Sequence, residues 1–280
     1  EKEAAGAMLQ ALRRNGFSVT GLRFDGAVLT VWMEQTRFRS AAKGLGRVAR
    51  ILAARAPGDV ESFRFLLTRR GLEVADLTVR REDIARGGNP LGQARSPGEA
   101  WQNARLQAPG VSPAGGPEHT AGRQYPGVSL SLSPAFRQSI GGPDQYYTFQ
   151  FYASATAEAR LAPGWTAAIN YGLDLYNNFD ALALDSNSVL PRVRSDIRQY
   201  LQQGSSGIFS FDTHYMANLW PNWYGKVSAG LFEPMYGGAG GEILYAPYGQ
   251  RWALGGEFYW VKKRAFDMNL EFQDYETTTG

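Results

Sequence analysis

Apolar and polar residues alternate in segment after segment between Tyr125 and Trp260. Apolar side chains recur at every second position, with Ser, Thr, Asn or charged residues between them. A period of two places the apolar residues on one face of a β-strand and the polar residues on the other. The pattern predicts seven antiparallel strands, at 128–136, 147–161, 165–175, 209–219, 223–231, 239–246 and 252–260.

Several of these segments are longer than the strands of most soluble proteins. A tilted strand needs about 9–11 residues to cross a bilayer, whereas strands in globular proteins usually have about 5–6. Aromatic residues gather at the segment ends, where they would meet lipid headgroups: Tyr147, Phe149, Trp165, Phe209, Trp220, Trp223, Trp252 and Trp260. We therefore predict an antiparallel transmembrane β-barrel (all-β) over 125–280, with Phe151, Leu173 and Phe211 facing lipid. Seven strands fall short of the roughly eight that a closed barrel needs, so an incomplete portion of a larger barrel is expected.

Connection lengths alternate along this region. The connections at 162–164, 221–222 and 247–250 are short, and those at 139–145, 180–207 and 233–238 are longer. Outer-membrane barrels place short turns in the periplasm and long loops outside the cell. The first strand would then start on the periplasmic side, and the segment before the barrel would be periplasmic.

Residues 1–86 have a different pattern, which predicts a small α+β domain. Apolar residues at helical spacing predict helices around Met8–Leu12 and Ala41–Leu52. Strand-like runs follow each helix, at 19–33 with a turn at Asp25-Gly26, and at 63–79 with a turn at Arg70-Gly71. The order helix, two strands, helix, two strands predicts helices packed on one sheet face.

Residues 87–124 are rich in Gly and Pro and poor in large aliphatic residues. Such composition predicts a linker between the two regions.

Composition narrows the classes of function. The formal net charge is only +3 and the basic residues are dispersed, which does not support dedicated nucleic-acid binding. The chain has no cysteine, so disulfides and thiolate metal sites are excluded. No run approaches the ~18 apolar residues of a transmembrane helix. The chain begins at Glu1 without an initiating Met or a signal peptide, as expected of an interior or processed fragment.

Three runs resemble the YjbH/GfcD family of outer-membrane proteins of exopolysaccharide and capsule biosynthesis. They are SLSPAFRQSIGGPDQYYTFQ ending at Gln150, LPRVRSDIRQYL at 190–201, and WYGKVSAGLFEPMYGGAGGEILYAPYGQRWALGGEFYWVKKR at 223–264. The resemblance implies a protein built from β-barrel and periplasmic α/β modules that acts in polysaccharide secretion with other envelope proteins. Members of that family are longer than this chain, and the resemblance supplies no catalytic residues.

Two groups of residues are candidates for contact with a glycan. Guanidinium groups bind carboxylate or phosphate in bidentate fashion, so arginines of the longest connection could bind an anionic sugar: Arg192, Arg194 and Arg198. Lumen-facing side chains could bind a passing glycan through hydrogen bonds: Glu158, Arg160, Asp174, Asp212, Lys226, Glu257 and Tyr259. A solvated amphipathic helix explains the arginines equally well, and pairing within the barrel wall explains the second group.

Two further motifs have plain structural explanations. Ser210, Asp212 and His214 share one strand face, but neighbours two apart are about 6.6–6.8 Å apart at the backbone, which is wide for a nucleophile and its base. Polar lining is the favoured interpretation. Gly237–Gly241 lacks the strand–turn–helix context of a phosphate loop and predicts a tight turn. No cofactor or metal site is expected.

The primary hypothesis is a non-enzymatic outer-membrane component of exopolysaccharide or capsule secretion or assembly, with the periplasmic domain docking other envelope secretion proteins. Its expected partners are a polysaccharide and outer-membrane lipid, with no nucleic acid. The alternative is a soluble β-sheet carbohydrate-binding module, which predicts aromatic residues in one exposed patch rather than two belts. A third hypothesis is a barrel-embedded hydrolase using Ser210 and His214.

Overall fold

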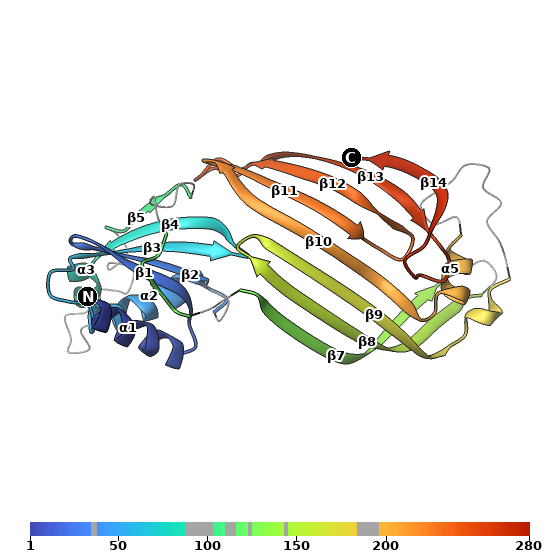
Figure 1. Ribbon diagram of the computed structural model, residues 1–280, viewed down its shortest axis with the longest axis horizontal. Coiled ribbons are helices and arrows are strands. Elements are labelled where there is room, and N and C mark those ends of the chain that lie inside the picture. Colours follow the sequence, from blue (N-terminus) through green and yellow to red (C-terminus); the bar gives the residue numbers. More distant parts are fainter. Residues whose placement is uncertain (35–37, 88–102, 110–115, 123–124, 143–144, 184–195) are drawn as a thin grey trace. The chain divides into compact units, whose positions relative to one another are not determined.

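The chain forms two β-sheets, one of six strands and one of eight, in a computed structural model (Figure 1). The structure describes all residues except 35–37, 88–102, 110–115, 123–124, 143–144 and 184–195. None of the helices in the described ranges is long and apolar enough to cross a membrane.

The first elements follow the predicted order of helix, two strands, helix, two strands. They are α1 (Lys2–Arg14), β1 (Ser18–Asp25), β2 (Val28–Glu34), α2 (Ala41–Ala53), β3 (Ser62–Arg69) and β4 (Leu72–Arg80), followed by α3 (Arg81–Gly87). β1 pairs with β2 and β3 with β4 in antiparallel fashion, whereas β2 and β3 pair in parallel. A parallel pair requires a crossover connection, and α2 lies within it.

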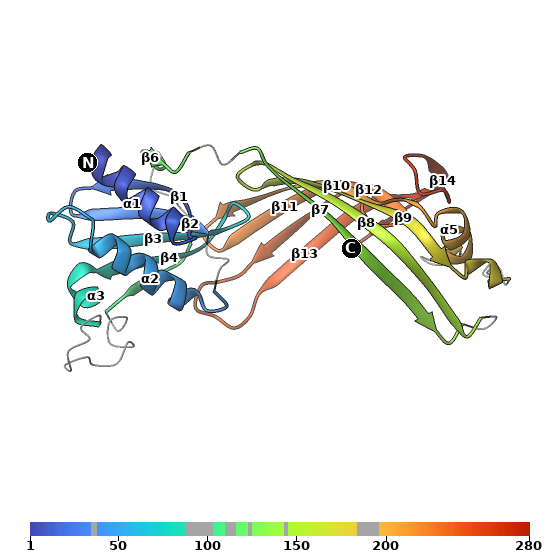
Figure 2. The same cartoon turned by 90° about the horizontal axis from the view of Figure 1, so that it is seen from below.

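One hydrophobic core joins the helices to this sheet. Met8 and Leu12 of α1 and Leu52 of α2 are fully buried against Phe63 and Phe65 of β3. Both helices lie on the same face of the sheet (Figure 2). Alternate residues of the strands point to this face, as the period-two pattern requires.

The region predicted to be a linker contains two short strands. β5 (Arg105–Gln107) pairs with β4, and β6 (His119–Thr120) pairs with β1. The prediction of a linker is wrong for these residues, because they complete the two edges of the six-stranded sheet. Backbone hydrogen bonds hold these two short strands in the sheet. They do not need the run of large apolar side chains by which a strand is predicted from sequence. The rest of the predicted linker falls largely on residues outside the described ranges.

The second sheet consists of long antiparallel strands in sequential order. They are β7 (Gly127–Ile140), β8 (Tyr147–Ala162), β9 (Trp165–Asn177), β10 (Gly207–Trp220), β11 (Trp223–Leu231), β12 (Tyr236–Tyr245), β13 (Leu254–Arg264) and β14 (Phe272–Thr279). A short 3₁₀ helix, η1 (Phe179–Ala181), and α5 (Ile197–Gln203) lie between β9 and β10. Among the described residues β7 and β14 are the two edges, so this sheet is open and not closed into a barrel.

The strand count and one connection differ from the expectation. β14 was not predicted, because Phe272 and Tyr275 are three positions apart and give no period-two signal. The connection between β11 and β12 is short, residues 232–235, rather than a longer loop at 233–238. The predicted turn before β9 is confirmed. Gly164 adopts a φ of 76° there, and a Cβ atom would lie 2.1 Å from the carbonyl oxygen of Met216.

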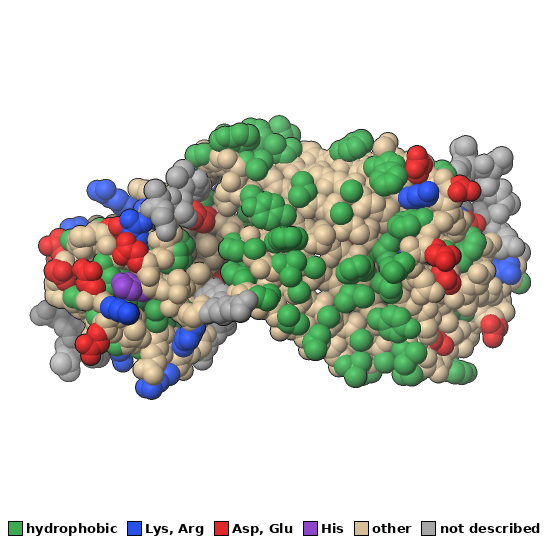
Figure 3. Space-filling model, viewed as in Figure 1, with side chains coloured by type: hydrophobic (Ala, Val, Ile, Leu, Met, Phe, Trp, Pro, Cys, Tyr) green, Lys and Arg blue, Asp and Glu red, His purple; other side chains and the backbone are tan. Residues whose placement is uncertain are grey.

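The apolar face of this sheet is solvent-exposed rather than packed against a second layer. Phe151, Leu173 and Phe211 lie on this face and are 49%, 50% and 47% exposed, and their contact with lipid stays a prediction. Leu132 on β7 and Leu254 on β13 are 77% and 70% exposed. Figure 3 shows hydrophobic side chains gathered over the strands of this sheet. We call this surface the apolar face.

One residue assigned to the apolar face lies on the opposite face. A β-bulge between Ile208 and Ser210 interrupts the alternation of β10, because a bulge inserts an extra residue into one strand. The ring of Phe209 therefore packs over Gly172 and contacts Tyr152 at a centroid separation of 5.4 Å. The placement of Phe209 in an outer aromatic belt was wrong.

Candidate functional site

The face opposite the apolar face carries most of the polar side chains of the eight-stranded sheet. We call it the polar face and define it by residues from six strands: Ser154, Thr156, Asn170, Asp212, His214, Lys226, Glu242 and Tyr259. All of these residues are partly buried. Hydrogen bonds join many of them across neighbouring strands, since side chains opposite each other on one face are within reach.

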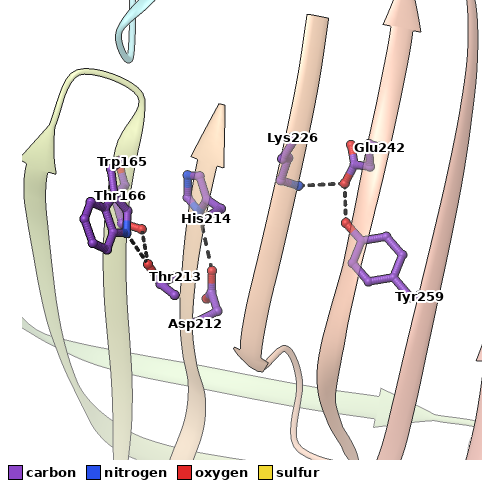
Figure 4. Close-up of polar contacts among 8 residues, drawn as sticks. All are labelled: Trp165, Thr166, Asp212, Thr213, His214, Lys226, Glu242 and Tyr259. Atoms are coloured by element: carbon purple, nitrogen blue, oxygen red, sulfur yellow. Dashed lines mark hydrogen bonds and ion pairs between the residues drawn. The ribbon is translucent and has the colours of Figure 1, made fainter. Parts of the chain in front are cut away.

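Three side chains from neighbouring strands meet on one oxygen atom (Figure 4). Lys226 Nζ on β11 donates to Glu242 Oε1 on β12 at 2.7 Å, and the hydroxyl of Tyr259 on β13 donates to the same oxygen. The ammonium group neutralises the carboxylate, and the phenol occupies one more of its acceptor sites. Sequence reasoning had selected Lys226 and Tyr259 but missed Glu242, which joins them.

Glycines of β12 make room for this arrangement. A Cβ atom on Gly240 would lie 2.2 Å from Tyr259 Cδ1, so the tyrosine ring crosses the strand where no side chain stands. The run Gly237–Gly241 is therefore part of β12 and not the tight turn that was expected. Its glycines allow close approach, which is the usual reason for glycine inside a strand.

The Tyr259→Phe variant is expected to lower the free energy of unfolding by about 1 kcal/mol. It removes one hydrogen bond to Glu242, which keeps its bond to Lys226, and an ordinary hydrogen bond contributes about 0.5–1.5 kcal/mol. Denaturant titration of the full-length protein measures the change. Tyr215→Phe is the matched control, because Tyr215 is 49% exposed on the apolar face. Equal effects of the two substitutions would contradict the assigned hydrogen bond.

The proposed hydrolase residues do not form a catalytic contact. His214 Nδ1 lies 3.5 Å from Asp212 Oδ2, and both project from β10 onto the polar face (Figure 4). In the described part of the chain Ser210 forms no side-chain hydrogen bond with either residue. Its backbone is four positions from His214, about 13 Å along a strand. A nucleophile must be within hydrogen-bond reach of its base, so this arrangement does not supply one.

A hydrogen-bond pair near the start of β9 belongs to the apolar face. Trp165 Nε1 donates to Thr213 Oγ1 at 2.8 Å, and that hydroxyl donates to the carbonyl oxygen of Thr166 at 3.1 Å. The polar atoms of Trp165 and Thr213 are thus satisfied within the protein. This removes the cost of placing them in an apolar environment.

The polar face continues toward the other end of the strands. Asn170 Nδ2 donates to Thr156 Oγ1 at 2.8 Å and to Ser154 Oγ at 3.1 Å. Farther along, Asp174 accepts from Gln150 Nε2 at 2.5 Å and from Asn177 Nδ2 at 2.9 Å. Asp174, a predicted glycan contact, is therefore held by amide groups within the sheet.

The structure brings together only part of the predicted ligand-binding set. Lys226 and Tyr259 meet at Glu242, and Asp212 pairs with His214, while Asp174 belongs to a separate group. Glu158 and Arg160 lie on β8 and Glu257 lies on β13. Within the described ranges the carboxylates of Glu158 and Glu257 form no ion pair, and no three His, Asp or Glu residues lie close enough to hold a metal ion.

The arginines of the longest connection are only partly described. Arg192 and Arg194 lie outside the described residues. Arg198 is on α5, where its Nη1 donates to the carbonyl oxygen of Ala183 at 2.7 Å and its Nε to Gln202 Oε1 at 3.1 Å. The first bond joins α5 to the segment that follows η1 and the second lies within α5, so these contacts of Arg198 are structural.

Arg264, which the sequence analysis did not select, is fully buried at the end of β13. Its guanidinium group donates to four backbone carbonyl oxygens: Glu233 and Ile208 at 2.7 Å, Met268 at 2.8 Å and Asn269 at 3.1 Å. The hydroxyl of Tyr200 on α5 donates to the carbonyl oxygen of Arg264 at 2.5 Å. Burial raises the pKa of Tyr200, which keeps this hydroxyl protonated as a donor. Arg264 follows two lysines in the sequence, and such a charge run usually marks a solvated face. No sequence signal therefore distinguished Arg264 as a buried residue.

Comparisons with known proteins give one family and one relative. The family model described as "YjbH: Exopolysaccharide biosynthesis protein YbjH" matches residues 1–280. The protein named "Uncharacterized lipoprotein YjbH" of Escherichia coli (strain K12) is 30% identical over 280 residues, which cover 95% of this chain and 38% of that protein. The chain thus spans well under half the length of this curated relative. No solved structure gives a significant match.

Proposed function

The chain belongs to the YjbH family of exopolysaccharide biosynthesis proteins, and from this premise we propose that it is a non-enzymatic outer-membrane component of polysaccharide secretion. In this proposal the eight-stranded sheet is part of a transmembrane β-barrel. Strands from the rest of the protein pair with the open edges of β7 and β14. The apolar face contacts acyl chains, and the polar face encloses the interior through which the glycan passes.

The exposure of the apolar face is the observation that carries this proposal. Large apolar side chains that are at least two fifths exposed recur on the long strands. Monomeric soluble proteins rarely expose contiguous apolar patches beyond a few hundred Å². Lipid removes the cost of that exposure, and a membrane strand needs one apolar face of this kind.

The distribution of aromatic residues supports lipid contact over a soluble carbohydrate-binding module. One group lies where β7 ends and β8 begins, with Phe136, Phe149 and Phe151 in mutual ring contact. Another group lies at opposite strand ends, where Tyr245 at the end of β12 contacts Trp223 and Trp252. Two groups at opposite strand ends fit two headgroup belts, whereas a soluble glycan-binding surface needs one patch.

The six-stranded sheet with its helices is proposed to be a periplasmic domain, formed by 1–86 with the edge strands β5 and β6, that docks other envelope secretion proteins. The two shortest connections of the eight-stranded sheet follow β8 and β10, and barrels place short turns in the periplasm. β7 starts at that same end. The name of the E. coli relative, a lipoprotein, is consistent with an envelope location.

Paired cysteine variants of the full-length protein test the lipid contact. Phe211→Cys and Asp212→Cys are neighbours on opposite faces of β10, and this region has no other cysteine. Each is labelled with an environment-sensitive fluorophore and reconstituted in vesicles with brominated acyl chains. We expect strong quenching at position 211 and little at 212, because bromine atoms reach only probes in the hydrocarbon region. Equal, weak quenching at both positions would refute membrane insertion, and a lipid anchor alone would give that result.

A cellular measurement tests the role in secretion. Cells that lack the protein are expected to release less exopolysaccharide and to retain it within the envelope, and the intact gene is expected to restore release. Unchanged release in the deletion strain would refute the secretion role, whatever the quenching result.

A further inference from the structure

A cavity of about 360 Å³ lies at the end of the eight-stranded sheet where β7 ends and β8 begins. Its walls come from these strand ends, η1, α5, the connection between β11 and β12, and Met268 before β14. Phe149 and Phe179 are among its apolar lining residues, and Gln138, Ser139 and Thr148 are among its polar ones. Its volume falls within the range of about 300–1,000 Å³ that is usual for small-molecule sites.

The walls of this cavity are held in place by specific bonds. Gln202 Nε2 on α5 donates to the carbonyl oxygens of Phe179 at 2.9 Å and Leu182 at 3.0 Å. Lys263 of β13 forms an ion pair with Asp196, the residue before α5. With the bond from Tyr200 to Arg264, these contacts attach α5 to both η1 and β13. The cavity is therefore formed before any ligand binds, which lowers the entropic cost of binding.

Two nitrogen atoms of one charged group in the wall have no hydrogen-bonding partner among the described residues. Arg137 of β7 lines the cavity, and its Nε and Nη2 atoms are buried without an acceptor. Three aromatic rings surround the guanidinium group, with Phe179 and Phe209 centroids at 5.3 Å and that of Tyr152 at 5.9 Å. Cation–π contacts stabilise the charge but leave the N–H groups of the two atoms unsatisfied. A buried donor without an acceptor costs about 1–3 kcal/mol.

The two nearby carboxylates, that of Asp174 and that of Glu233 in the cavity wall, do not fill this role. Gln150 faces Arg137 across the β7–β8 pair, and its amide donates to Asp174 Oδ1. The other oxygen of Asp174 accepts from Asn177. In the described part of the chain Arg137 forms no ion pair, so its positive charge is available to an incoming anion.

Nε and Nη2, the two atoms of Arg137 that lack an acceptor within the described ranges, are the same pair that binds a carboxylate at another arginine of this chain. Arg64 Nε donates to Asp76 Oδ1 at 3.0 Å, and its Nη2 donates to Oδ2 at 2.6 Å. This side-on arrangement matches the planar, bidentate geometry of a carboxylate. In Arg137, whose side chain lines the cavity, the same two atoms are buried and have no acceptor among the described residues.

We propose that this cavity binds a carboxylate-bearing sugar residue, with the carboxylate paired with the guanidinium group of Arg137. This inference rests on the proposed function, because the sugar residue would belong to the secreted polysaccharide. The ring of Phe179 provides apolar surface for a pyranose ring, and Ser139 and Thr148, on the same sheet face as Arg137, provide partners for its hydroxyl groups. The site selects acidic glycans, because a neutral sugar would leave the guanidinium donors unsatisfied.

Calorimetric titration of the full-length protein in detergent tests the proposal. The probes are a trisaccharide of galacturonic acid, its methyl ester and inorganic phosphate. We expect the acid to bind at least tenfold more tightly than the ester, and phosphate to bind no more tightly than the ester. Equal binding of acid and ester by the unmodified protein would overturn the proposal without any variant. Phosphate binding as tight as that of the acid would overturn the assignment to a sugar.

Substitutions locate the effect at Arg137. Arg137→Gln is expected to lower affinity for the acid at least tenfold, and Arg137→Lys to lower it less, because lysine keeps the charge but loses the two-pronged geometry. Arg251→Gln is the matched control, since Arg251 is exposed outside the cavity, and it is expected to bind normally. Normal binding by Arg137→Gln would overturn the site. Failure of these tests leaves the quenching and release results unaffected, so the two proposals can be distinguished.

Discussion

Leu132→Arg is expected to lower the free energy of unfolding in a phospholipid bilayer by about 2–4 kcal/mol, the cost of arginine near the middle of a membrane barrel. Leu132 lies midway along β7 and is 77% exposed. If its surroundings are acyl chains, the guanidinium group loses its hydration there. If they are water, an exposed leucine can become arginine at almost no cost. Reversible urea unfolding of the full-length protein in vesicles measures the difference.

Ser133→Arg is the matched control for this experiment. Ser133 is the next residue of the same strand, is also exposed, and points to the polar face. The same charge at the same depth is therefore expected to change stability by less than about 1 kcal/mol, since substitutions toward a barrel interior are tolerated. Equal effects of the two arginines would mean that the apolar face is not in contact with lipid.

Arg264→Met is expected to destabilise the protein by about 3–5 kcal/mol. The substitution keeps much of the side-chain volume but leaves four backbone carbonyl oxygens without their donor. Each buried unsatisfied group costs about 1–3 kcal/mol, and the costs are not additive because the carbonyls share one partner. The affected segments come from β10, the connection before β12 and the connection before β14. Hydrogen exchange is expected to show their loss of protection together.

Two further substitutions make this prediction specific. Arg264→Lys keeps the charge but offers fewer donors from a single nitrogen atom, so an intermediate loss is expected. Arg251→Met removes an exposed arginine and is expected to change stability by less than about 0.5 kcal/mol. A neutral effect of Arg264→Met would show that the four carbonyls find other partners and that Arg264 does not organise this end of the sheet.

Local patterns were sufficient to predict most elements and the two faces of the long strands. Period two alone separated Leu132 from Ser133, and helical spacing alone placed Met8 and Leu52 in the core of the first sheet. These predictions succeeded because side-chain direction in a strand or helix depends on nearby residues only. The same reasoning missed β14, whose pairing with β13 supplies what its own pattern lacks.

Candidate contacts were harder to predict than faces. The residue types that line the polar face followed from the alternation, yet the partner of Lys226 and Tyr259 did not. Glu242 joins them only because β11, β12 and β13 are neighbours in a particular register. Register depends on bulges and turns that a hydrophobic pattern does not specify. The bulge that turns Phe209 toward Arg137 shows the same dependence.

By itself the sequence determined that long strands present one apolar and one polar face, and that an α/β region precedes them. Only the tertiary structure decided that the eight-stranded sheet is open among the described residues. It also decided that the buried Arg264 donates to four carbonyl oxygens. The same is true of Arg137, which lines a cavity and has two nitrogen atoms without an acceptor among the described residues. The physical reason is the distance along the sequence between the residues that interact. Alternation is a property of adjacent residues, whereas burial of a charge depends on segments as much as 56 positions apart, such as Arg264 and Ile208.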